Sequence, residues 1–136
     1  MIVVDTGVLY AAADVDDNDH AACRDLINGH PGPLVVPLPV IGETSYMIGK
    51  RLGAAAEARF VAACGRGEVT VDHLVTADLM RMAELVDTYA NLPLGTIDAS
   101  VVAVAERLGT SEIATLDHRD FSVVRPVHSA AFTLLP

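Results

Sequence analysis

The sequence has few cysteines, no long hydrophobic run and few basic residues, and each shortage excludes a class of protein. The only cysteines are Cys23 and Cys64, and they have neither zinc-site spacing nor the spacing of a redox pair. We therefore expect a reduced, cytoplasmic protein in which both thiols are small core residues. The apolar runs, such as residues 8–13, are too short to span a bilayer, and the start lacks the features of a secretory signal.

Positive charge is also scarce. Nine Lys and Arg residues stand against 18 Asp and Glu residues, which gives a net charge of −9 at pH 7. This balance argues against a protein that holds nucleic acid by bulk electrostatics. It fits a basic partner, or a site in which bound cations offset local negative charge.

Hydrophobic residues, in contrast, are abundant. They make up 51% of 136 residues, enough for a single domain with a real core. The mean hydropathy of +0.40 indicates more apolar surface than a small monomer buries, which favours a dimer or a partner groove.

Short apolar runs alternate with helical patterns along the chain. Buried strands are predicted over residues 1–5, 34–36, 68–72 and 113–116, with a late strand pair at 123–124 and 132–135. Helices are predicted over 7–13, 18–28, 39–52, 54–64, 76–90 and 98–108. In the helix over 18–28 we expect Ala22 and Leu26, together with Cys23, to face inward. We also expect Thr76 to be an N-terminal cap, and Gly53 and Gly109 to stop helices. The alternation predicts an α/β fold with parallel strands.

Four acidic residues occupy apolar surroundings. Asp5 and Asp117 end predicted strands, whereas Glu43 and Asp98 lie on apolar helix faces. A buried carboxylate is costly unless it is paired or bound to a metal ion. Because ligands gather at the carboxyl ends of parallel strands, we expect the four side chains to converge at one edge of the sheet.

Each acid also has a simpler interpretation. The three aspartates suit helix caps or turns, and Glu43 suits an ion pair with Lys50 or Arg51. Four carboxylates brought together, however, raise one another's pKa values, and a divalent cation removes that repulsion. Oxygen ligands without a His or Cys pattern favour Mg²⁺ over zinc. A site of this kind activates water and stabilises charge on a phosphate, which predicts phosphodiester hydrolysis.

The order and spacing of these acids resemble a known family. The matching motifs are Val3-Val4-Asp5-Thr6, Val40-Ile41-Gly42-Glu43, Ile97-Asp98-Ala99-Ser100 and Ala114-Thr115-Leu116-Asp117-His118-Arg119-Asp120-Phe121. They resemble the motifs of PIN-domain ribonucleases, in particular the VapC-type toxins of bacterial, and above all mycobacterial, toxin–antitoxin pairs. The resemblance implies that residues 1–136 form one PIN domain, a three-layer α/β/α sandwich with a central, mainly parallel sheet.

The resemblance also implies an activity and partners. These are Mg²⁺-dependent (or Mn²⁺-dependent) endonuclease action on RNA, a homodimer and inhibition by a VapB-type antitoxin. The short apolar runs separately predict no membrane association. Asp5, Glu43, Asp98 and Asp117 match the acidic positions, with Asp5 and Asp98 holding the metal most directly.

Two threonines receive roles from the same resemblance, and three basic residues are candidates because of their charge and position. Thr6 and Thr115 match positions that orient a carboxylate or a water molecule from behind the metal. Arg119 is the foremost candidate for substrate contact. Lys50 and Arg51 are further candidates, each with the alternative of a solvated helix face.

Two questions stay open in the sequence, and one further resemblance is rejected. Asp120 is either an extra ligand or an exposed turn residue. The alternative function is a non-catalytic PIN-like module that binds RNA or protein. The triplet Asp5-Thr6-Gly7 resembles that of retroviral-type aspartic proteases, but those enzymes are all-β and this chain is rich in helical patterns.

Overall fold

Five short strands form one parallel sheet at the centre of the molecule. The computed structural model describes residues 1–136, and its strands are β1 (Ile2–Val4), β2 (Leu34–Pro37), β3 (Thr70–Asp72), β4 (Glu112–Ala114) and β5 (Thr133–Leu135). Their order is β3-β2-β1-β4-β5, and every neighbouring pair is parallel. Val3 of the central strand pairs with Val35 on one side and with Ile113 on the other. The residues that follow β1, β2 and β4 therefore emerge at the same edge.

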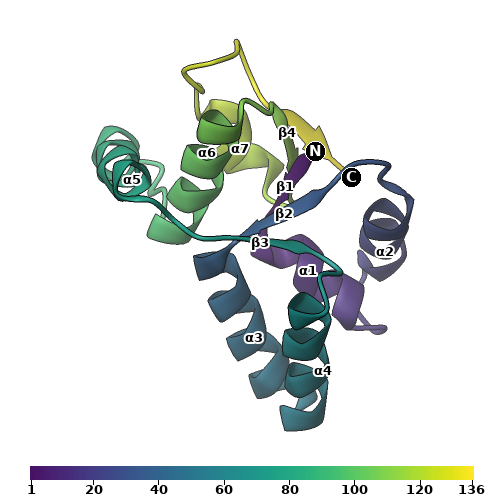
Figure 1. The fold of residues 1–136 in the computed structure, drawn as a ribbon. Helices are drawn as coiled ribbons and strands as arrows, with labels where there is room; N and C mark the ends of the chain where they lie inside the picture. Colours follow the sequence, from purple (N-terminus) through teal and green to yellow (C-terminus); the bar gives the residue numbers. More distant parts are fainter.

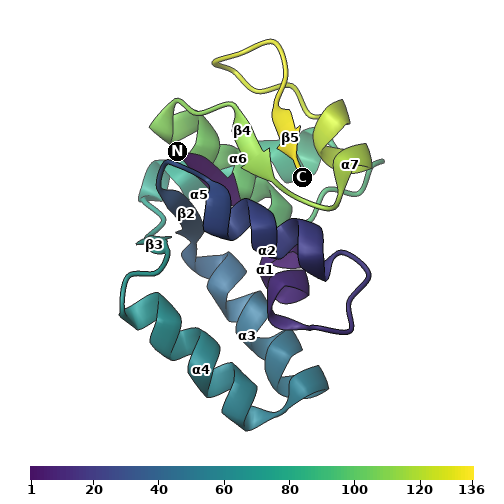
Figure 2. The same cartoon turned by 90° about the vertical axis from the view of Figure 1, so that its right-hand side faces the viewer.

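Seven helices surround the sheet: α1 (Thr6–Ala13), α2 (His20–Gly29), α3 (Leu38–Leu52), α4 (Ala54–Gly65), α5 (Thr76–Thr88), α6 (Thr96–Leu108) and α7 (His118–Val123). Figure 1 shows α5 and α6 on one side of the sheet and α1 and α2 on the other. In both views α3 and α4 lie side by side and project beyond the sheet (Figures 1 and 2). This arrangement confirms the predicted three-layer α/β/α sandwich. None of the helices combines the length and the hydrophobicity needed to cross a membrane.

The core explains why the central strand and α6 are the most apolar elements. All three residues of β1 are fully buried, and Val35 and Val36 of β2 are buried beside them. Seven consecutive residues of α6, Ala99–Ala105, are also buried. A helix that is buried on every side needs apolar residues around its whole circumference. The sheet covers one side of α6 and α5 covers the other, so the run of Ala and Val in α6 satisfies both.

Two predicted glycine stops are confirmed. Gly53 has φ +95° and ψ 168° between α3 and α4, and Gly109 has φ +71° in the left-handed region at the end of α6. Side chains disfavour both conformations, so glycine ends each helix without strain.

Three local predictions were wrong. Residues 123–124 do not form a strand, because the Asp117 side chain caps α7 and this helix continues to Val123. Thr76 is the first residue of α5 rather than its cap; Val75 precedes the helix, and its N–H donates to Asp78 at 2.9 Å. Ala22 is exposed, because the inward face of α2 follows Cys23, which is buried, and Leu26, which packs half-buried against the core; these two expected positions are confirmed.

Candidate metal centre

Three of the four predicted acids lie at helix N-termini on the carboxyl edge of the sheet. Asp5 follows β1 and caps α1, accepting a hydrogen bond from the Thr6 N–H at 2.8 Å. Asp117 follows β4 and caps α7. Asp98 lies in the first turn of α6. The positive end of each helix dipole stabilises the adjacent carboxylate, so capping and metal binding are compatible roles here.

Asp5 is the most deeply buried of the four, with 7% of its surface exposed. Its Oδ2 accepts a hydrogen bond from the Thr115 hydroxyl at 2.9 Å, and that hydroxyl in turn accepts from the Asp117 N–H at 3.0 Å. Thr115 therefore connects the two predicted metal-binding segments from behind. Burial raises the pKa of Asp5, and the hydrogen bonds from Thr6 and Thr115 partly oppose that rise.

Thr6 contacts Asp5 through its backbone and not through its side chain. The hydroxyl of Thr6 is buried and has no hydrogen-bond partner within the protein. A buried, unpaired hydroxyl is costly unless something else satisfies it. This group therefore remains available to a bound water or ligand next to Asp5.

The closest group of carboxylates consists of Asp98, Asp117 and Asp120, whose ligand oxygens all lie within 4.8 Å of one another. Burial, followed by the negative charge of Asp5 and Asp117, raises the pKa of Asp98 to about 7. Desolvation and Asp117 also raise the pKa of Asp120. A divalent cation relieves this repulsion, so the donor set fits Mg²⁺ or a similar hard ion.

Asp5 and Glu43 are not members of that closest group. Both nevertheless contribute to the raised pKa of Asp98 through their negative charge. Glu43 and Asp98 line the same hollow of about 390 Å³. Glu43 forms no ion pair with Lys50 or Arg51, so an ion pair does not explain why this acid lies on the helix face. Four predicted acids thus share one edge of the sheet, and Asp120 joins them.

Asp120 is the residue whose importance the sequence left undecided. It lies in the first turn of α7, and its N–H donates to Asp117 Oδ1 at 3.1 Å. The helix α7 was not predicted. Without this helix, the three-residue spacing between Asp117 and Asp120 did not indicate that their carboxylates lie close together. On a helical turn, that spacing brings the two carboxylates to the same side.

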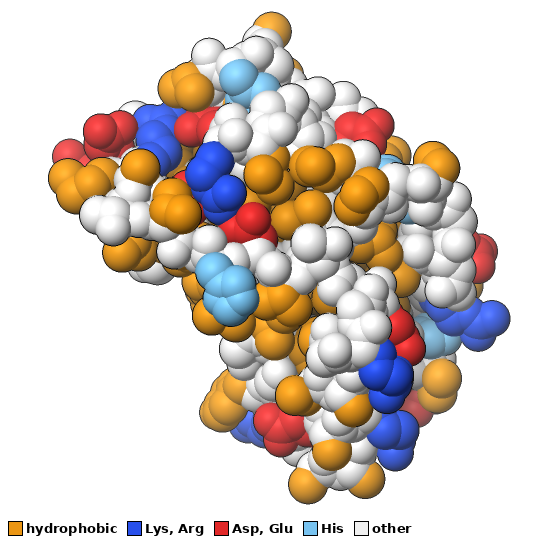
Figure 3. Space-filling model, viewed as in Figure 1, with side chains coloured by type: hydrophobic (Ala, Val, Ile, Leu, Met, Phe, Trp, Pro, Cys, Tyr) orange, Lys and Arg blue, Asp and Glu red, His pale blue; other side chains and the backbone are white.

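The candidate substrate contacts differ in their surroundings. The Arg51 guanidinium lies 5.0 Å from the centre of the Tyr10 ring, towards α1. The Lys50 ammonium lies 5.8 Å from the centre of the Tyr46 ring. Arg119 is exposed on α7, adjacent to Asp120. On the face shown in Figure 3, basic side chains lie singly or in small groups and form no continuous positive surface.

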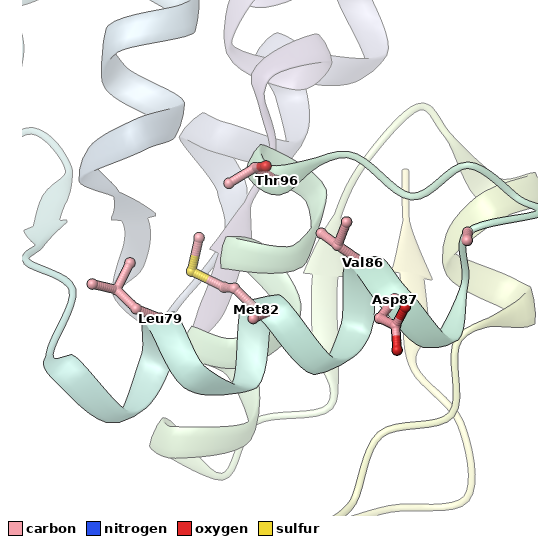
Figure 4. A pocket seen from close by; sticks show the side chains of 7 residues that line it. Leu79, Met82, Val86, Asp87 and Thr96 are labelled. Carbon is pink, nitrogen blue, oxygen red and sulfur yellow. The ribbon is translucent and has the colours of Figure 1, made fainter.

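A second hollow, of about 560 Å³, lies against α5 and is mostly apolar. Figure 4 shows Leu79, Met82 and Val86 along it, with Thr96 of α6 on the other side. Asp87 is its only acidic residue, so it offers no metal site. Thr96 lines both hollows, which places this apolar groove next to the acidic one.

Known proteins are similar to this chain in sequence and in fold. The PIN domain model matches residues 2–125. Ribonuclease VapC26 of Mycobacterium tuberculosis (strain ATCC 25618 / H37Rv) is 33% identical over 135 residues, which cover 99% of this chain and 100% of that protein. The crystal structure of M. tuberculosis VapC20, a sarcin-ricin loop cleaving toxin, superposes with a TM-score of 0.85 at 22% identity, covering 96% of this chain and 99% of that one. The chain belongs to the PIN domain family and, within it, to the VapC-type proteins.

Proposed function

We propose that this protein is a metal-dependent endoribonuclease that acts as the toxin of a toxin–antitoxin pair. The observation that carries the proposal is the convergence of Asp98, Asp117 and Asp120 with Asp5 and Glu43 at one edge of the sheet. The 33% identity with a protein named as a ribonuclease supports RNA as the substrate.

The donor set favours Mg²⁺, with Mn²⁺ as a substitute, held by Asp98, Asp117 and Asp120 together with Asp5. When bound, such an ion lowers the pKa of a water molecule and stabilises negative charge on the scissile phosphate. Thr115 fixes the Asp5 carboxylate by its hydrogen bond at 2.9 Å. Glu43 lines the accessible hollow, where its carboxylate can accept the proton of the attacking water. The products expected from this chemistry carry a 5′-phosphate and a 3′-hydroxyl.

The partners follow from the same assignment. An arginine from a VapB-type antitoxin would pair with the clustered carboxylates and block the site. Arg119 lies beside Asp120, where it can meet the phosphate backbone of bound RNA. We also propose a homodimer, supported by the mean hydropathy of +0.40 and by exposed Leu79 and Met80 on α5. A cytoplasmic location accords with a toxin that meets cellular RNA.

The test is RNA cleavage by Asp5→Asn and Asp98→Asn proteins in the presence of Mg²⁺. We expect each change to reduce cleavage by at least about 100-fold, because it removes charge from the metal centre, where even an orienting partner is worth about 10- to 100-fold. Asp87→Asn is the matched control, since Asp87 is an exposed acid on α5. Undiminished cleavage by both site variants would refute the proposal.

The competing function is a non-catalytic PIN-like module that binds RNA or protein. Titration calorimetry separates the two proposals. Absence of Mg²⁺ and Mn²⁺ binding, combined with intact RNA or antitoxin binding, would favour the module. Metal binding that is lost in Asp98→Asn would favour the enzyme.

A further inference from the structure

Helix α3 carries an exposed aromatic–basic pair on the side that also bears Glu43. Tyr46 and Lys50 follow Glu43 by three and seven residues, so the three side chains share one side of the helix. Tyr46 is 65% exposed, and the Lys50 ammonium lies 5.8 Å from its ring centre. At a rise of about 1.5 Å per residue, Lys50 is roughly 10 Å along the helix from Glu43. The pair therefore starts one turn away from the acidic hollow.

The exposure of Tyr46 is unusual within this chain. Tyr10 is buried, and Tyr89 is half-buried with its hydroxyl accepting a hydrogen bond from the Arg125 N–H at 2.9 Å. No phenylalanine is exposed. Tyr46 is thus the one aromatic residue whose ring lies largely in solvent. The fold gains nothing from this exposure, because an aromatic side chain stabilises a protein by burial.

Lys50 is a basic residue whose charge is not neutralised by a carboxylate. It is the only lysine of the chain, and it forms no ion pair. Arg66, Arg81 and Arg107, in contrast, are neutralised by neighbouring carboxylates. Five arginines also form no ion pair, so Lys50 is distinguished by its position over an exposed aromatic ring, where its charge is free to bind a phosphate.

The helix also leaves room beside Tyr46 on the side of the metal centre. Gly42 lies four residues before Tyr46, and a Cβ placed on it would meet no heavy atom within 4 Å. Lys50 approaches the ring from the other direction, four residues after it. A planar group can therefore reach Tyr46 from the side of Gly42, which is also the side of Glu43.

We propose that Tyr46 and Lys50 form a binding platform for single-stranded RNA, a role that rests on the proposed ribonuclease function. One base stacks on the Tyr46 ring in the space above Gly42, and the Lys50 ammonium binds a neighbouring phosphate. Single-stranded RNA is recognised by aromatic stacking combined with local positive charge, which does not require a basic protein. The platform directs the strand towards the hollow lined by Glu43 and Asp98.

The experiment compares substitutions that separate stacking from packing. Cleavage of a fluorescent, randomised single-stranded RNA pool in Mg²⁺ gives kcat and KM, and fluorescence anisotropy in EDTA gives Kd. We expect Tyr46→Leu, which keeps apolar bulk but has no π face, to raise KM and Kd by about 5- to 150-fold, the effect of losing one base stack. We expect kcat to change by less than about twofold, because no reacting group is altered. Tyr46→Phe keeps the ring and should behave as the wild type.

The charge and the open space are tested separately. Lys50→Gln should reduce the slope of log Kd against log salt by about 0.7, the value of one contact with a single-stranded phosphate. Arg24→Gln, which removes one exposed charge from α2, should leave that slope unchanged. Gly42→Leu should raise KM while raising the unfolding midpoint, because leucine fills the stacking space but favours the helix.

Three other results would contradict the proposed RNA-binding platform. Unchanged KM and Kd in Tyr46→Leu, with cleavage still lost in Asp98→Asn, would overturn the platform and leave the ribonuclease intact. Loss of self-association in Tyr46→Leu, seen by sedimentation with Kd unchanged, would make this surface a protein contact instead. A wild-type protein that neither binds nor cuts RNA would overturn both proposals.

Discussion

At the scale of single residues, Thr115 decides how the acidic edge is held. Its hydroxyl donates to Asp5 and accepts from the Asp117 N–H, and the residue is fully buried. One hydroxyl thus fixes the side chain that follows β1 and the backbone that follows β4. The sequence indicated a supporting role for Thr115 only through the family resemblance, because the contact joins residues 110 positions apart.

Replacing this hydroxyl by a methyl group tests its role. We expect Thr115→Val to lower the free energy of unfolding by about 1–3 kcal/mol, because the buried Asp5 Oδ2 and the partly buried Asp117 N–H each lose a partner. We also expect metal affinity to fall by about 10- to 100-fold, because the Asp5 carboxylate is no longer oriented. Urea unfolding and titration calorimetry with Mg²⁺ measure the two effects.

Thr115→Ser is the matched control, since it keeps the hydroxyl. It should retain metal affinity within about threefold and lose only the small packing contribution of one methyl group, about 1 kcal/mol. Equal losses of metal affinity in the Thr115→Val and Thr115→Ser proteins would show that the hydroxyl has no orienting role.

At the scale of elements, the helices were largely predictable and the irregular end of the chain was not. The predicted stops at Gly53 and Gly109 are confirmed because they depend on local backbone preference. The helix α7 was missed because it spans only His118–Val123 and depends on the Asp117 cap. The strand β5 pairs with β4, and its partner could not be identified from residues 132–135 alone.

The connection between α3 and α4 provides the first element-scale prediction. Gly53→Ala should lower the free energy of unfolding by about 1–3 kcal/mol, because φ +95° with ψ 168° is a conformation that essentially only glycine adopts. No heavy atom lies within 4 Å of the added Cβ, so the effect is one of backbone strain alone. Urea denaturation measures it. Gly65→Ala, with the same open space but no positive φ, should be neutral or slightly stabilising.

The contact between α5 and α6 provides the second element-scale prediction. Asp78 of α5 is 3% exposed, and Arg107 of α6 donates to its two oxygens at 3.0 and 3.1 Å. Arg107→Ala should lower the free energy of unfolding by about 3 kcal/mol, because a buried carboxylate then lacks its counter-charge. Thermal or urea unfolding measures this loss. Arg107→Lys keeps the charge and should retain part of the stability; a loss as large as that of Arg107→Ala would assign the effect to geometry instead.

At the scale of the whole molecule, the concentration of negative charge at one edge links stability to pH and to metal. The pKa of Asp98 is about 7 in the fold against a usual value of 3.8. Between about pH 4 and pH 7 the folded protein retains a proton that the unfolded chain has lost. Without metal, this carboxyl therefore lowers the free energy of unfolding as pH rises through that window, and its full destabilising effect is present above pH 7.

Mg²⁺ competes with that proton for the same carboxylates. We expect Mg²⁺ at 100 times its Kd to raise the Tm by about 10 °C at pH 8, and by clearly less at pH 5. Differential scanning calorimetry in Mg²⁺ and in EDTA measures both shifts. Asp98→Asn should raise the Tm of the metal-free protein at pH 8 and flatten its pH dependence; a Mg²⁺ effect of equal size at both pH values would contradict the assignment.

The sequence by itself determined the alternation of helices with parallel strands and the four acids predicted for the metal centre, whereas the three layers were implied by the family resemblance. Hydrophobic periodicity and glycine stops are local, so they can be read from neighbouring residues. Tertiary structure alone decided which carboxylates lie within 4.8 Å of one another. The group that does so includes Asp120 and leaves out Asp5 and Glu43. It also decided that Lys50, rather than Arg51, is paired with an exposed ring. Distances between side chains depend on how helices are rotated and packed against the sheet, and no local pattern in the chain records that rotation.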